Sequence, residues 1–249
     1  MKLLGVDIGG SGIKGAPVDV DVGRFTEDRL RVATPDPAEP EAVAEVVGEI
    51  VAHFGGGAAV GVTFPGVITD GVIGSAANLG EAWLGVDGRA LFGAATGAPV
   101  TLVNDADAAG IAEMTYGAGR GRRGTVLVLT FGTGIGSALF ADGDLVPNTE
   151  LGHLELHGKD AEKHASSHAR ETHDWGWHTW AQHVGEYLRM VEHLLAPKLI
   201  IIGGGVSRKA DRFLPYIDDV RAEVVPAELH NSAGIVGAAM LAAKGDVRP

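Results

Sequence analysis

The chain has 249 residues and a formal net charge of −12, because 32 Asp and Glu outnumber 20 Lys and Arg. The length favours one large or two small domains, the 45% of hydrophobic residues is typical of a globular protein, and the absence of cysteine excludes disulfides, Cys-ligated metal sites and a thiol nucleophile. The acidic balance argues against general nucleic-acid binding, since phosphate backbones require a basic surface.

Short apolar runs alternate with helical patterns in the first half of the chain, which indicates an α/β fold. Residues 3–8 and 13–20 predict two strands joined by a glycine-rich turn at 9–12. Further along, the patterns predict a helix at 41–54, a strand at 58–64, a short strand at 100–103 and a helix at 106–116.

The second half repeats this plan. A strand at 125–130, a glycine-rich turn at 132–136 and a strand at 137–141 match the pattern of residues 3–20, which predicts an internal duplication. Residues 157–173 are polar and show no strand or core signal, so we expect a mobile segment there. The remaining predicted elements are a long amphipathic helix at 175–195, a buried strand at 199–202 and a last helix at 233–243.

Three glycine-rich segments follow predicted strands, at residues 7–15, 129–136 and 201–207. Glycine lets the backbone approach a ligand closely and turn its N–H groups toward an anion. In the first segment, Lys14 would add a cation and Asp7 a carboxylate for a hydrated metal ion. The spacing matches neither a P-loop nor a dinucleotide fingerprint. Each turn alone fits a purely structural role, but two of them in duplicated hairpins favour a site for a phosphate chain.

Two further motifs place polar side chains where they can act on a hydroxyl-bearing ligand. Asn104 and Asp105 lie between a predicted strand and helix, where α/β folds bind their ligands, and a carboxylate there can accept a proton from a substrate hydroxyl. Either residue can instead cap the helix. Glu150 and His153 suit directed hydrogen bonds to adjacent hydroxyls, although a polar turn alone would also explain them.

In this order, the motifs resemble those of the sugar kinases of the actin/hexokinase/Hsp70 superfamily, and more narrowly the ROK family. The matching segments are phosphate-1 at 4–15, connect-1 at 103–110, phosphate-2 at 127–140, adenosine at 200–207 and connect-2 at 231–240. The resemblance implies an α/β, two-domain actin-like ATPase (ribonuclease H-like) fold with an interdomain cleft. It implies an N-terminal domain at 1–105, completed by a last helix at about 234–249, and a C-terminal domain at 106–233.

The segment from Glu150 to Glu162 refines this resemblance. Most ROK kinases carry a cysteine-rich zinc motif after Gly-His, whereas this chain keeps Gly152-His153 without cysteines, so we expect no structural zinc. The segment resembles that of the polyphosphate glucokinases of actinobacterial type, a branch of the family. The resemblance implies phosphorylation of glucose at its 6-hydroxyl by inorganic polyphosphate or also by ATP, with Mg²⁺, in a homodimer.

The resemblance also implies a role for each matching residue. Asp105 would be the catalytic base, and Asp7 would position Mg²⁺ through water. The sugar would contact Gly66, Asn78, Asn104, Asp105, Glu150, His153 and, as a weaker candidate, Glu171. The donor phosphates would contact Gly9, Gly10, Gly12, Lys14, Thr133 and Gly134, and a nucleotide base would border Gly204 and Gly205.

A polyanionic donor conflicts with the net charge of −12, so its site needs a local basic lining. The candidates are Lys14, Lys159, Lys163, Arg170, Arg208 and Lys209, each of which is also an ordinary surface charge. A further hypothesis is that His173, His178 and His183 help to hold polyphosphate at mildly acidic pH, where imidazole is charged.

Three alternatives to a polyphosphate-dependent kinase differ in activity. One is a strictly ATP-dependent ROK hexose kinase, and another is a sugar-binding module without catalysis. The third is a sugar-sensing ROK regulator, which we do not expect because the first strand begins at Leu3 and leaves no room for a helix-turn-helix segment ahead of it. No apolar run is long enough for a membrane span, and Asp7 comes too early for a signal peptide, so we expect a cytoplasmic protein with no membrane partner.

Overall fold

The computed structural model describes residues 1–76 and 79–245 and divides the chain into two compact units. The first unit consists of Met1–Ala112 together with Ser232–Pro249, and the second unit is Glu113–Asn231. Helix α3 (Asp105–Tyr116) spans the division. The predicted boundary after residue 105 and the expected interdomain cleft stay predictions. Among the residues that the structure describes, no helix is both long and apolar enough to cross a membrane.

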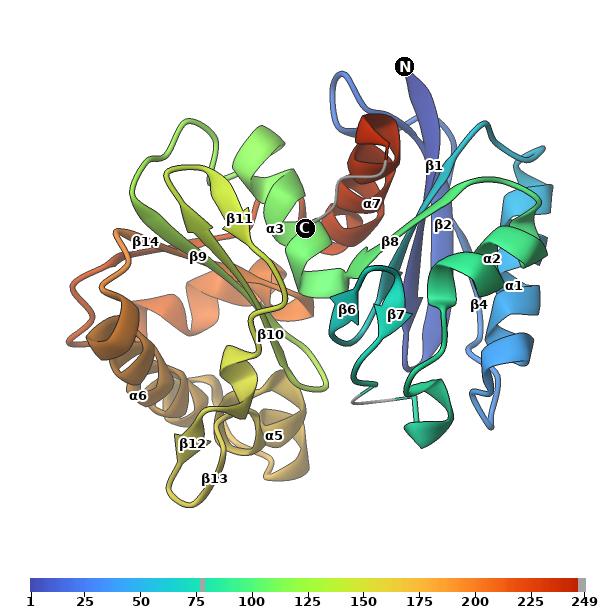
Figure 1. The fold of residues 1–249 in the computed structure, drawn as a ribbon. Helices are drawn as coiled ribbons and strands as arrows, with labels where there is room; N and C mark the ends of the chain where they lie inside the picture. Colours follow the sequence, from blue (N-terminus) through green and yellow to red (C-terminus); the bar gives the residue numbers. More distant parts are fainter. Residues whose placement is uncertain (77–78, 246–249) are drawn as a thin grey trace. The chain divides into compact units, whose positions relative to one another are not determined.

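The first unit is built on a six-stranded mixed sheet (Figure 1). Strands β1 (Lys2–Gly9) and β2 (Gly12–Asp19) form an antiparallel hairpin, while β1, β5 (Val60–Phe64) and β8 (Val100–Asn104) run parallel. The order is β3-β2-β1-β5-β8, with β4 also paired to β2. The other elements are β3 (Arg24–Phe25), β4 (Leu30–Val32), β6 (Ile68–Thr69), β7 (Val72–Ile73), α1 (Pro40–His53), α2 (Gly88–Thr96), α7 (Ala233–Lys244) and the 3-10 helix η1 (Glu81–Trp83).

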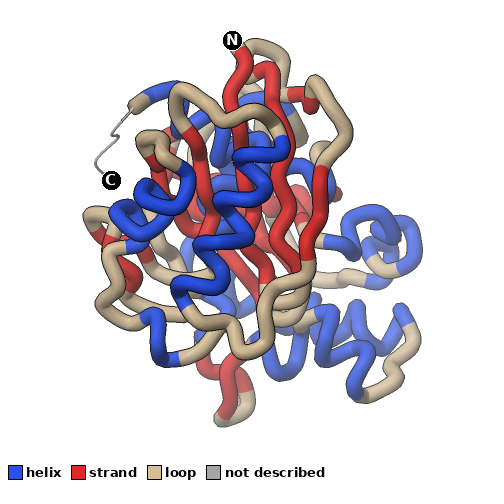
Figure 2. Tube along the Cα trace, turned by 90° about the vertical axis from the view of Figure 1, so that its right-hand side faces the viewer, coloured by secondary structure: helices blue, strands red, loops and turns tan. Residues whose placement is uncertain are grey.

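Helices cover both faces of this sheet, and Figure 2 looks onto the face covered by α1 and α2. Helix α1 buries Val43 and Ile50, which lie on one helical face, and Ile50 packs so closely on β2 that a Cβ at Gly15 would come within 2.4 Å of it. On the other face, a Cβ at Gly5 would lie 2.0 Å from the carbonyl oxygen of Ile235 in α7. Glycine at these positions therefore lets the helices pack closely on the sheet.

The second unit is built on a five-stranded sheet in the order β11-β10-β9-β14-β15. Strands β9 (Thr125–Phe131) and β10 (Ile135–Ala141) form an antiparallel hairpin, and β14 (Leu199–Gly203) runs parallel to β9 and β15 (Glu223–Pro226). The remaining elements are β11 (Asp144–Val146), β12 (Glu155–Leu156), β13 (Lys159–Asp160), α4 (Glu162–Ala165), α5 (Ser167–Thr172), α6 (Trp177–Leu195) and the 3-10 helices η2 (Leu151–His153), η3 (Gly205–Arg212), η4 (Leu214–Tyr216) and η5 (His230–Ser232).

Helix α6 supplies much of the core of the second unit. Trp180, Val184 and Leu188 recur at intervals of four residues and are fully buried, together with Val191 one turn further on. They pack in one apolar cluster with β9 and β14. The amphipathic pattern at 175–195 therefore predicted the helix and its buried face, although Leu195 is only partly buried.

Residues 157–173 contain β13, α4 and α5, so the expectation that this segment lacks strand and core residues is wrong. Ala161, Ala165 and Ala169 recur every four residues and are buried. Small alanines among polar neighbours give a weak hydrophobic signal, which is why the sequence did not reveal this packing. Ser166 also caps α5, since its hydroxyl accepts a hydrogen bond from the N–H of Ala169 at 3.0 Å.

The two sheets follow the same plan. In each, an antiparallel hairpin with a glycine-rich turn (β1–β2 or β9–β10) has its first strand paired in parallel with a later strand, β5 or β14. The structure thus repeats the arrangement that the sequence pattern predicted for residues 3–20 and 125–141.

Candidate active site

One edge of the first sheet gathers the predicted site residues of this unit. Strands β1, β5 and β8 run parallel, and the register pairs Asp7 with Thr63. The glycine turn after β1, Gly66 after β5 and Asp105 after β8 therefore lie at the same carboxyl edge. Open α/β sheets bind their ligands at this edge, so the topology alone groups these residues.

Asp7, near the end of β1, is held by two neighbouring strands. Its Oδ1 accepts a hydrogen bond from the Thr63 hydroxyl at 2.9 Å, and its Oδ2 lies 3.6 Å from Nζ of Lys14, its partner on β2. Helix α7 also packs against it, since a Cβ at Gly234 would lie 3.2 Å from Oδ1. The Asp7 side chain is 23% exposed, so the carboxylate still reaches water.

Two cations border the turn between β1 and β2. Arg31 of β4 pairs in register with Lys14, and its Nη2 donates a hydrogen bond to the carbonyl of Ser11 at 2.8 Å. The same guanidinium lies against Gly12, where a Cβ would come within 2.8 Å of its Cζ. Because residue 12 has no side chain, the cation rests directly on the turn.

Asn104 and Asp105 stand at the beginning of α3. The Oδ1 of Asn104 accepts hydrogen bonds from the N–H groups of Ala106 at 2.9 Å and Asp107 at 3.0 Å, so Asn104 caps the helix. With one of its two amide hydrogens, its Nδ2 donates to the carbonyl of Gly66 at 3.1 Å. Asp105 accepts a hydrogen bond from the N–H of Ala106 at 2.8 Å.

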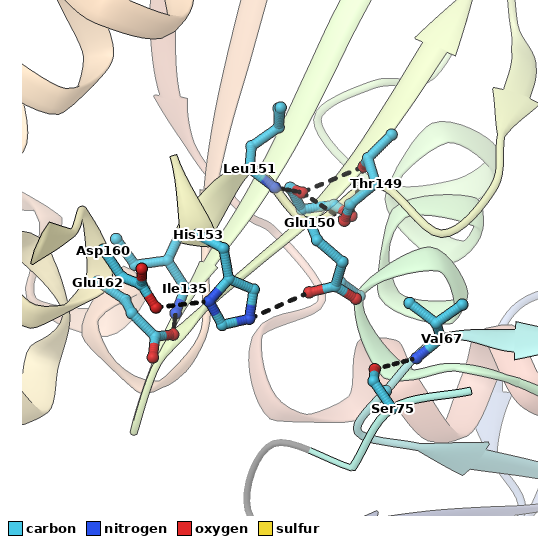
Figure 3. Close-up of polar contacts among 12 residues, drawn as sticks. Val67, Ser75, Ile135, Thr149, Glu150, Leu151, His153, Asp160 and Glu162 are labelled. Atoms are coloured by element: carbon cyan, nitrogen blue, oxygen red, sulfur yellow. Dashed lines mark hydrogen bonds and ion pairs between the residues drawn. The ribbon is translucent and has the colours of Figure 1, made fainter. Parts of the chain in front are cut away.

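Gly66 is in close contact with the segment that follows β7. A Cβ at Gly66 would lie 1.9 Å from the carbonyl oxygen of Ser75, whose hydroxyl accepts a hydrogen bond from the N–H of Val67 at 2.9 Å (Figure 3). Glycine is therefore required here by packing, whether or not it also borders a sugar. Asn78, predicted to contact the sugar, lies outside the described residues.

In the second unit, two glycine turns leave the same edge of the sheet, because Gly203 of β14 pairs with Thr130 of the parallel strand β9. Gly204 has a φ of +78°, and a Cβ there would lie 2.3 Å from the carbonyl oxygen of Phe131, so glycine is needed for both conformation and space. Thr133 is exposed in the other turn, where its hydroxyl can reach a ligand.

Glu150 and His153 lie on a segment that is fixed to β10. The buried hydroxyl of Ser137 donates to the carbonyl of Thr149 at 2.7 Å and accepts a hydrogen bond from the N–H of Leu151 at 3.0 Å. One buried serine thus holds the backbone on both sides of Glu150.

The imidazole of His153 lies between two carboxylates (Figure 3). Its Nδ1 is 2.9 Å from Oδ2 of Asp160, and its Nε2 is 3.8 Å from Oε2 of Glu150. The hydrogen bond with Asp160 raises the pKa of His153 above its usual value, and the charges of Glu162 and Glu150 act in the same direction. Burial raises the pKa of Glu150. A carboxylate beside an imidazole in this geometry can hydrogen-bond two adjacent hydroxyls of one ligand.

Helices α4 and α5 support the glycine turn between β9 and β10. The Oε2 of Glu162 accepts a hydrogen bond from the N–H of Ile135 at 3.2 Å, and a Cβ at Gly134 would lie 2.2 Å from the same oxygen. At the other end of the turn, the N–H of His168 donates to the carbonyl of Gly132 at 3.0 Å. The segment predicted to be mobile therefore contacts the phosphate-2 turn directly.

His153, Asp160 and Glu162 offer ligand atoms within 4.8 Å of one another, and they form the group of possible metal ligands in the described part of the chain. The hydrogen bonds of Asp160 to His153 and of Glu162 to Ile135 account for this cluster, and we assign no metal to it. The prediction that the protein has no structural zinc stays a prediction.

Comparison with known protein families matches residues 3–166 to the ROK family. The chain belongs to the ROK family. It is 52% identical to the polyphosphate glucokinase of Mycobacterium tuberculosis strain H37Rv over 238 residues, which cover 95% of this chain and 89% of that protein. The polyphosphate glucokinase of Mycobacterium leprae is 50% identical over 238 residues, which cover 95% of this chain and 73% of that protein.

Two solved structures share this fold. The inorganic polyphosphate/ATP-glucomannokinase of Arthrobacter sp. strain KM superposes with a TM-score of 0.95 at 52% identity, covering 98% of each chain. A ROK glucokinase of Streptomyces griseus, solved in complex with glucose and AMPPNP, gives a TM-score of 0.83 at 26% identity and covers 98% of this chain and 100% of that one. The predicted α/β, actin-like ATPase fold of the ROK sugar kinases is therefore confirmed.

Of the sugar ligands predicted from the ROK resemblance in the second unit, Glu150 and His153 lie together, and the role of Glu171 stays a prediction. Glu171 is exposed on α5, and its ion pair is with Arg170 at 3.6 Å. The sequence reasoning missed five supporting residues, for which side-chain type and spacing gave no signal: Arg31, Thr63, Ser137, Asp160 and Glu162.

Proposed function

We propose that this ROK-family enzyme transfers the terminal phosphoryl group of inorganic polyphosphate to the 6-hydroxyl of glucose, forming glucose 6-phosphate and a polyphosphate one unit shorter. The observation that carries the proposal is the similarity to polyphosphate glucokinases along the whole chain, 52% identity over 95% of its length. The arrangement of the predicted residues in each unit supports it.

Asp105 is proposed as the catalytic base. It follows β8 at the carboxyl edge of the first sheet, and Asn104 accepts hydrogen bonds from both Ala106 and Asp107 N–H at the start of α3, while Asp105 shares only that of Ala106. As the bond between the sugar oxygen and phosphorus forms and the bond to the leaving phosphate breaks, the hydroxyl proton passes to the Asp105 carboxylate. Phosphoryl transfer passes through a loose transition state, so the proton leaves late, and positioning together with charge stabilisation supplies most of the acceleration.

The glucose ring is proposed to be held by Asn104, Glu150 and His153, with Gly66 and Asn78 beside it. Glu150 accepts hydrogen bonds from ring hydroxyls, and His153 Nε2, which points toward Glu150, takes part in a hydrogen bond with a neighbouring hydroxyl. Glu171, exposed and paired with Arg170, is kept only as a minor candidate.

The donor phosphates are proposed to lie on the turn of residues 9–12, with further contacts from Lys14, Thr133 and Gly134. Arg31 extends this set, because its guanidinium rests on the turn at Gly12 and it is exposed. A polyanion approaching a protein of net charge −12 needs such local cations.

Asp7 is proposed to hold Mg²⁺ through water. The surroundings of Asp7 fit a hydrated Mg²⁺ ion. One carboxylate oxygen is fixed by the Thr63 hydroxyl, and the side chain is 23% exposed, so the carboxylate can accept hydrogen bonds from water around the ion. Mg²⁺ keeps several waters and binds through one or two carboxylates together with substrate phosphates. The ion would neutralise charge on the transferred phosphoryl group.

A strictly ATP-dependent hexose kinase is the second candidate. The observation in its favour is the similarity to the Streptomyces griseus glucokinase, which was solved with AMPPNP. In this chain a nucleotide base would border Gly204 and Gly205 in the turn after β14, beside Val206. We further propose a cytoplasmic homodimer, for which gel filtration with light scattering is the test.

The test is a kinase assay with two donors, polyphosphate and ATP, and two sugars, glucose and mannose, in the presence of Mg²⁺. We expect formation of glucose 6-phosphate with polyphosphate. Turnover with ATP alone would establish the second candidate instead. Glucose binding without turnover by either donor would make the protein a sugar sensor and overturn the proposal.

A further inference from the structure

We infer that Asp160 is a positioning residue for glucose: it holds the imidazole of His153 so that Nε2 faces the sugar beside Glu150. The inference rests on the proposed function, because it assigns a task to a residue that supports a proposed sugar ligand. Asp160 itself need not touch the sugar.

The first support is the geometry of the imidazole. The Oδ2 of Asp160 lies 2.9 Å from Nδ1 of His153, while Nε2 on the opposite side of the ring lies 3.8 Å from Oε2 of Glu150 (Figure 3). An ionised carboxylate only accepts hydrogen bonds, so Nδ1 carries the proton whenever this contact is made. Nε2 of the neutral ring is then an acceptor, and its direction is set by the bond on the other side.

The second support is that the backbone brings Asp160 to this place. Strands β12 and β13 form a small hairpin in which Glu155 pairs with Asp160, and the N–H of Ala161 donates to the carbonyl of Leu154 at 2.8 Å. The tip of the hairpin turns through His157 and Gly158, which both have positive φ. The chain thus returns to His153 by a defined turn, and the carboxylate arrives seven residues after the imidazole.

The third support is the charge around the ring. The carboxylates that act on His153 are Asp160, Glu150 and Glu162, and all three favour its protonated form. His153 and Asp160 have side chains 43% and 47% exposed, so their hydrogen bond adds little to the stability of the fold. Its effect should instead appear in how well the ring is oriented for a ligand.

Two substitutions separate orientation from charge. Asp160→Asn keeps an oxygen that can accept the hydrogen bond of Nδ1 and removes the charge, whereas Asp160→Ala removes both. The matched control is Glu186→Gln, because Glu186 forms a similar pair with His157, at 2.7 Å between carboxylate and Nε2, in the same unit. Thermal unfolding of each variant shows that it is folded.

The first measurement is the glucose KM and kcat with saturating donor. The second is an NMR titration of the His153 ring nitrogens, whose signals are identified because they are missing from the spectrum of His153→Gln. We expect Asp160→Ala to raise the glucose KM about tenfold, because a misoriented His153 loses its hydrogen bond to the sugar, and a charge-assisted hydrogen bond contributes about this much to binding. The kcat should change less than threefold. Asp160→Asn should raise KM less than threefold. Both variants should lower the pKa of His153, and Glu186→Gln should change neither quantity.

The two proposals fail differently. If the wild-type protein does not phosphorylate glucose, the proposed function fails. If it does, and either the glucose KM of Asp160→Ala or the titration of His153 equals that of the wild type, the positioning role of Asp160 is overturned.

Discussion

The two glycine hairpins of this chain share one topology and differ in what surrounds their turns. The turn between β1 and β2 has two cations beside it, Lys14 and Arg31. The turn between β9 and β10 has a carboxylate, since Glu162 accepts the hydrogen bond of the Ile135 N–H. The two hairpins therefore share a backbone plan and differ in the charged groups that contact their turns.

This difference indicates a division of labour between the two units. An anion is attracted to the first turn, whereas at the second it meets a carboxylate that already occupies one backbone donor. The second unit instead presents Glu150 and His153, which suit hydroxyl groups. Substitution of Asp105 or Arg31 in the first unit should therefore alter kcat or donor use, and substitution of Glu150 in the second unit should alter the glucose KM.

The largest expected effect comes from Asp105, in the first unit. Asp105→Ala should lower kcat at least 100-fold, the lower end of contributions from a general base, and leave the glucose Kd within a few-fold. Steady-state kinetics with polyphosphate and calorimetric titration with glucose measure the two quantities. A kcat near that of the wild type would remove Asp105 from the mechanism and with it the assignment of chemistry to the first unit.

The next prediction concerns Glu150 in the second unit, whose substitution should change the glucose KM by less than Asp105→Ala changes kcat. Glu150→Gln should raise the glucose KM about tenfold, because an ionised acceptor of hydroxyl hydrogen bonds becomes neutral. Burial raises the pKa of Glu150, so acidification protonates it at a higher pH than an ordinary glutamate. The glucose KM of the wild type should accordingly rise as the pH falls toward 5, while that of Glu150→Gln stays flatter.

Profiles of glucose KM against pH with both proteins check this prediction. Parallel profiles would show that another group is responsible for the pH dependence. An unchanged KM in Glu150→Gln at neutral pH would remove Glu150 from the sugar site.

The longer strands, the helices α1, α3, α6 and α7 and the glycine turns could be predicted from the sequence, because apolar periodicity and glycine clusters are local signals. The α6 face of Trp180, Val184 and Leu188 is an example. The short strands, such as β4 and β15, and helix α2 were not predicted. Contacts that depend on strand register could not be predicted. Arg31 reaches the first turn only because β4 pairs with β2, and Thr63 reaches Asp7 only because β5 pairs with β1. Nothing near either residue in the chain marks that pairing.

For the candidate site, too, local motifs could be predicted, whereas contacts between distant residues could not. The order of motifs indicated Asp105, Glu150 and His153, and Asn104 proved to be the helix cap that had been one of two alternatives. The polar segment 157–173 hid Asp160 and Glu162, because polar residues that support a site look the same in sequence as polar residues in solvent. Their contacts with His153 and Ile135 depend on a turn that only the structure shows.

Arg31 tests the cationic character of the first turn. Arg31→Ala should raise the KM for polyphosphate about threefold to fivefold at low salt and less at high salt, because an exposed charge is screened by ions. The glucose KM should not change. Arg24→Ala is the matched control, since Arg24 is also exposed in the first unit, on β3. Equal polyphosphate KM values for Arg31→Ala and Arg24→Ala would contradict the assignment of Arg31 to the donor.

The smallest expected effect concerns the histidines of the second unit. Polyphosphate bound beside them would give that unit a donor contact beyond those proposed for Thr133 and Gly134. The indole of Trp175 is stacked between His173 and His183, with ring centroids 4.6 and 4.1 Å away. Burial, together with the charges of other histidines, lowers the pKa of His183, so this ring becomes charged only below its usual range. Trp175 fluorescence, taken as the difference from Trp175→Phe, should therefore change with a midpoint below pH 6.5.

If polyphosphate binds beside the rings of His173 and His183, it stabilises the charged form and moves the midpoint upward by a fraction of a pH unit. His183→Gln should abolish the shift. A midpoint that polyphosphate leaves unchanged would reject the histidine hypothesis and leave the cationic turn of the first unit as the place where the donor's charge is met.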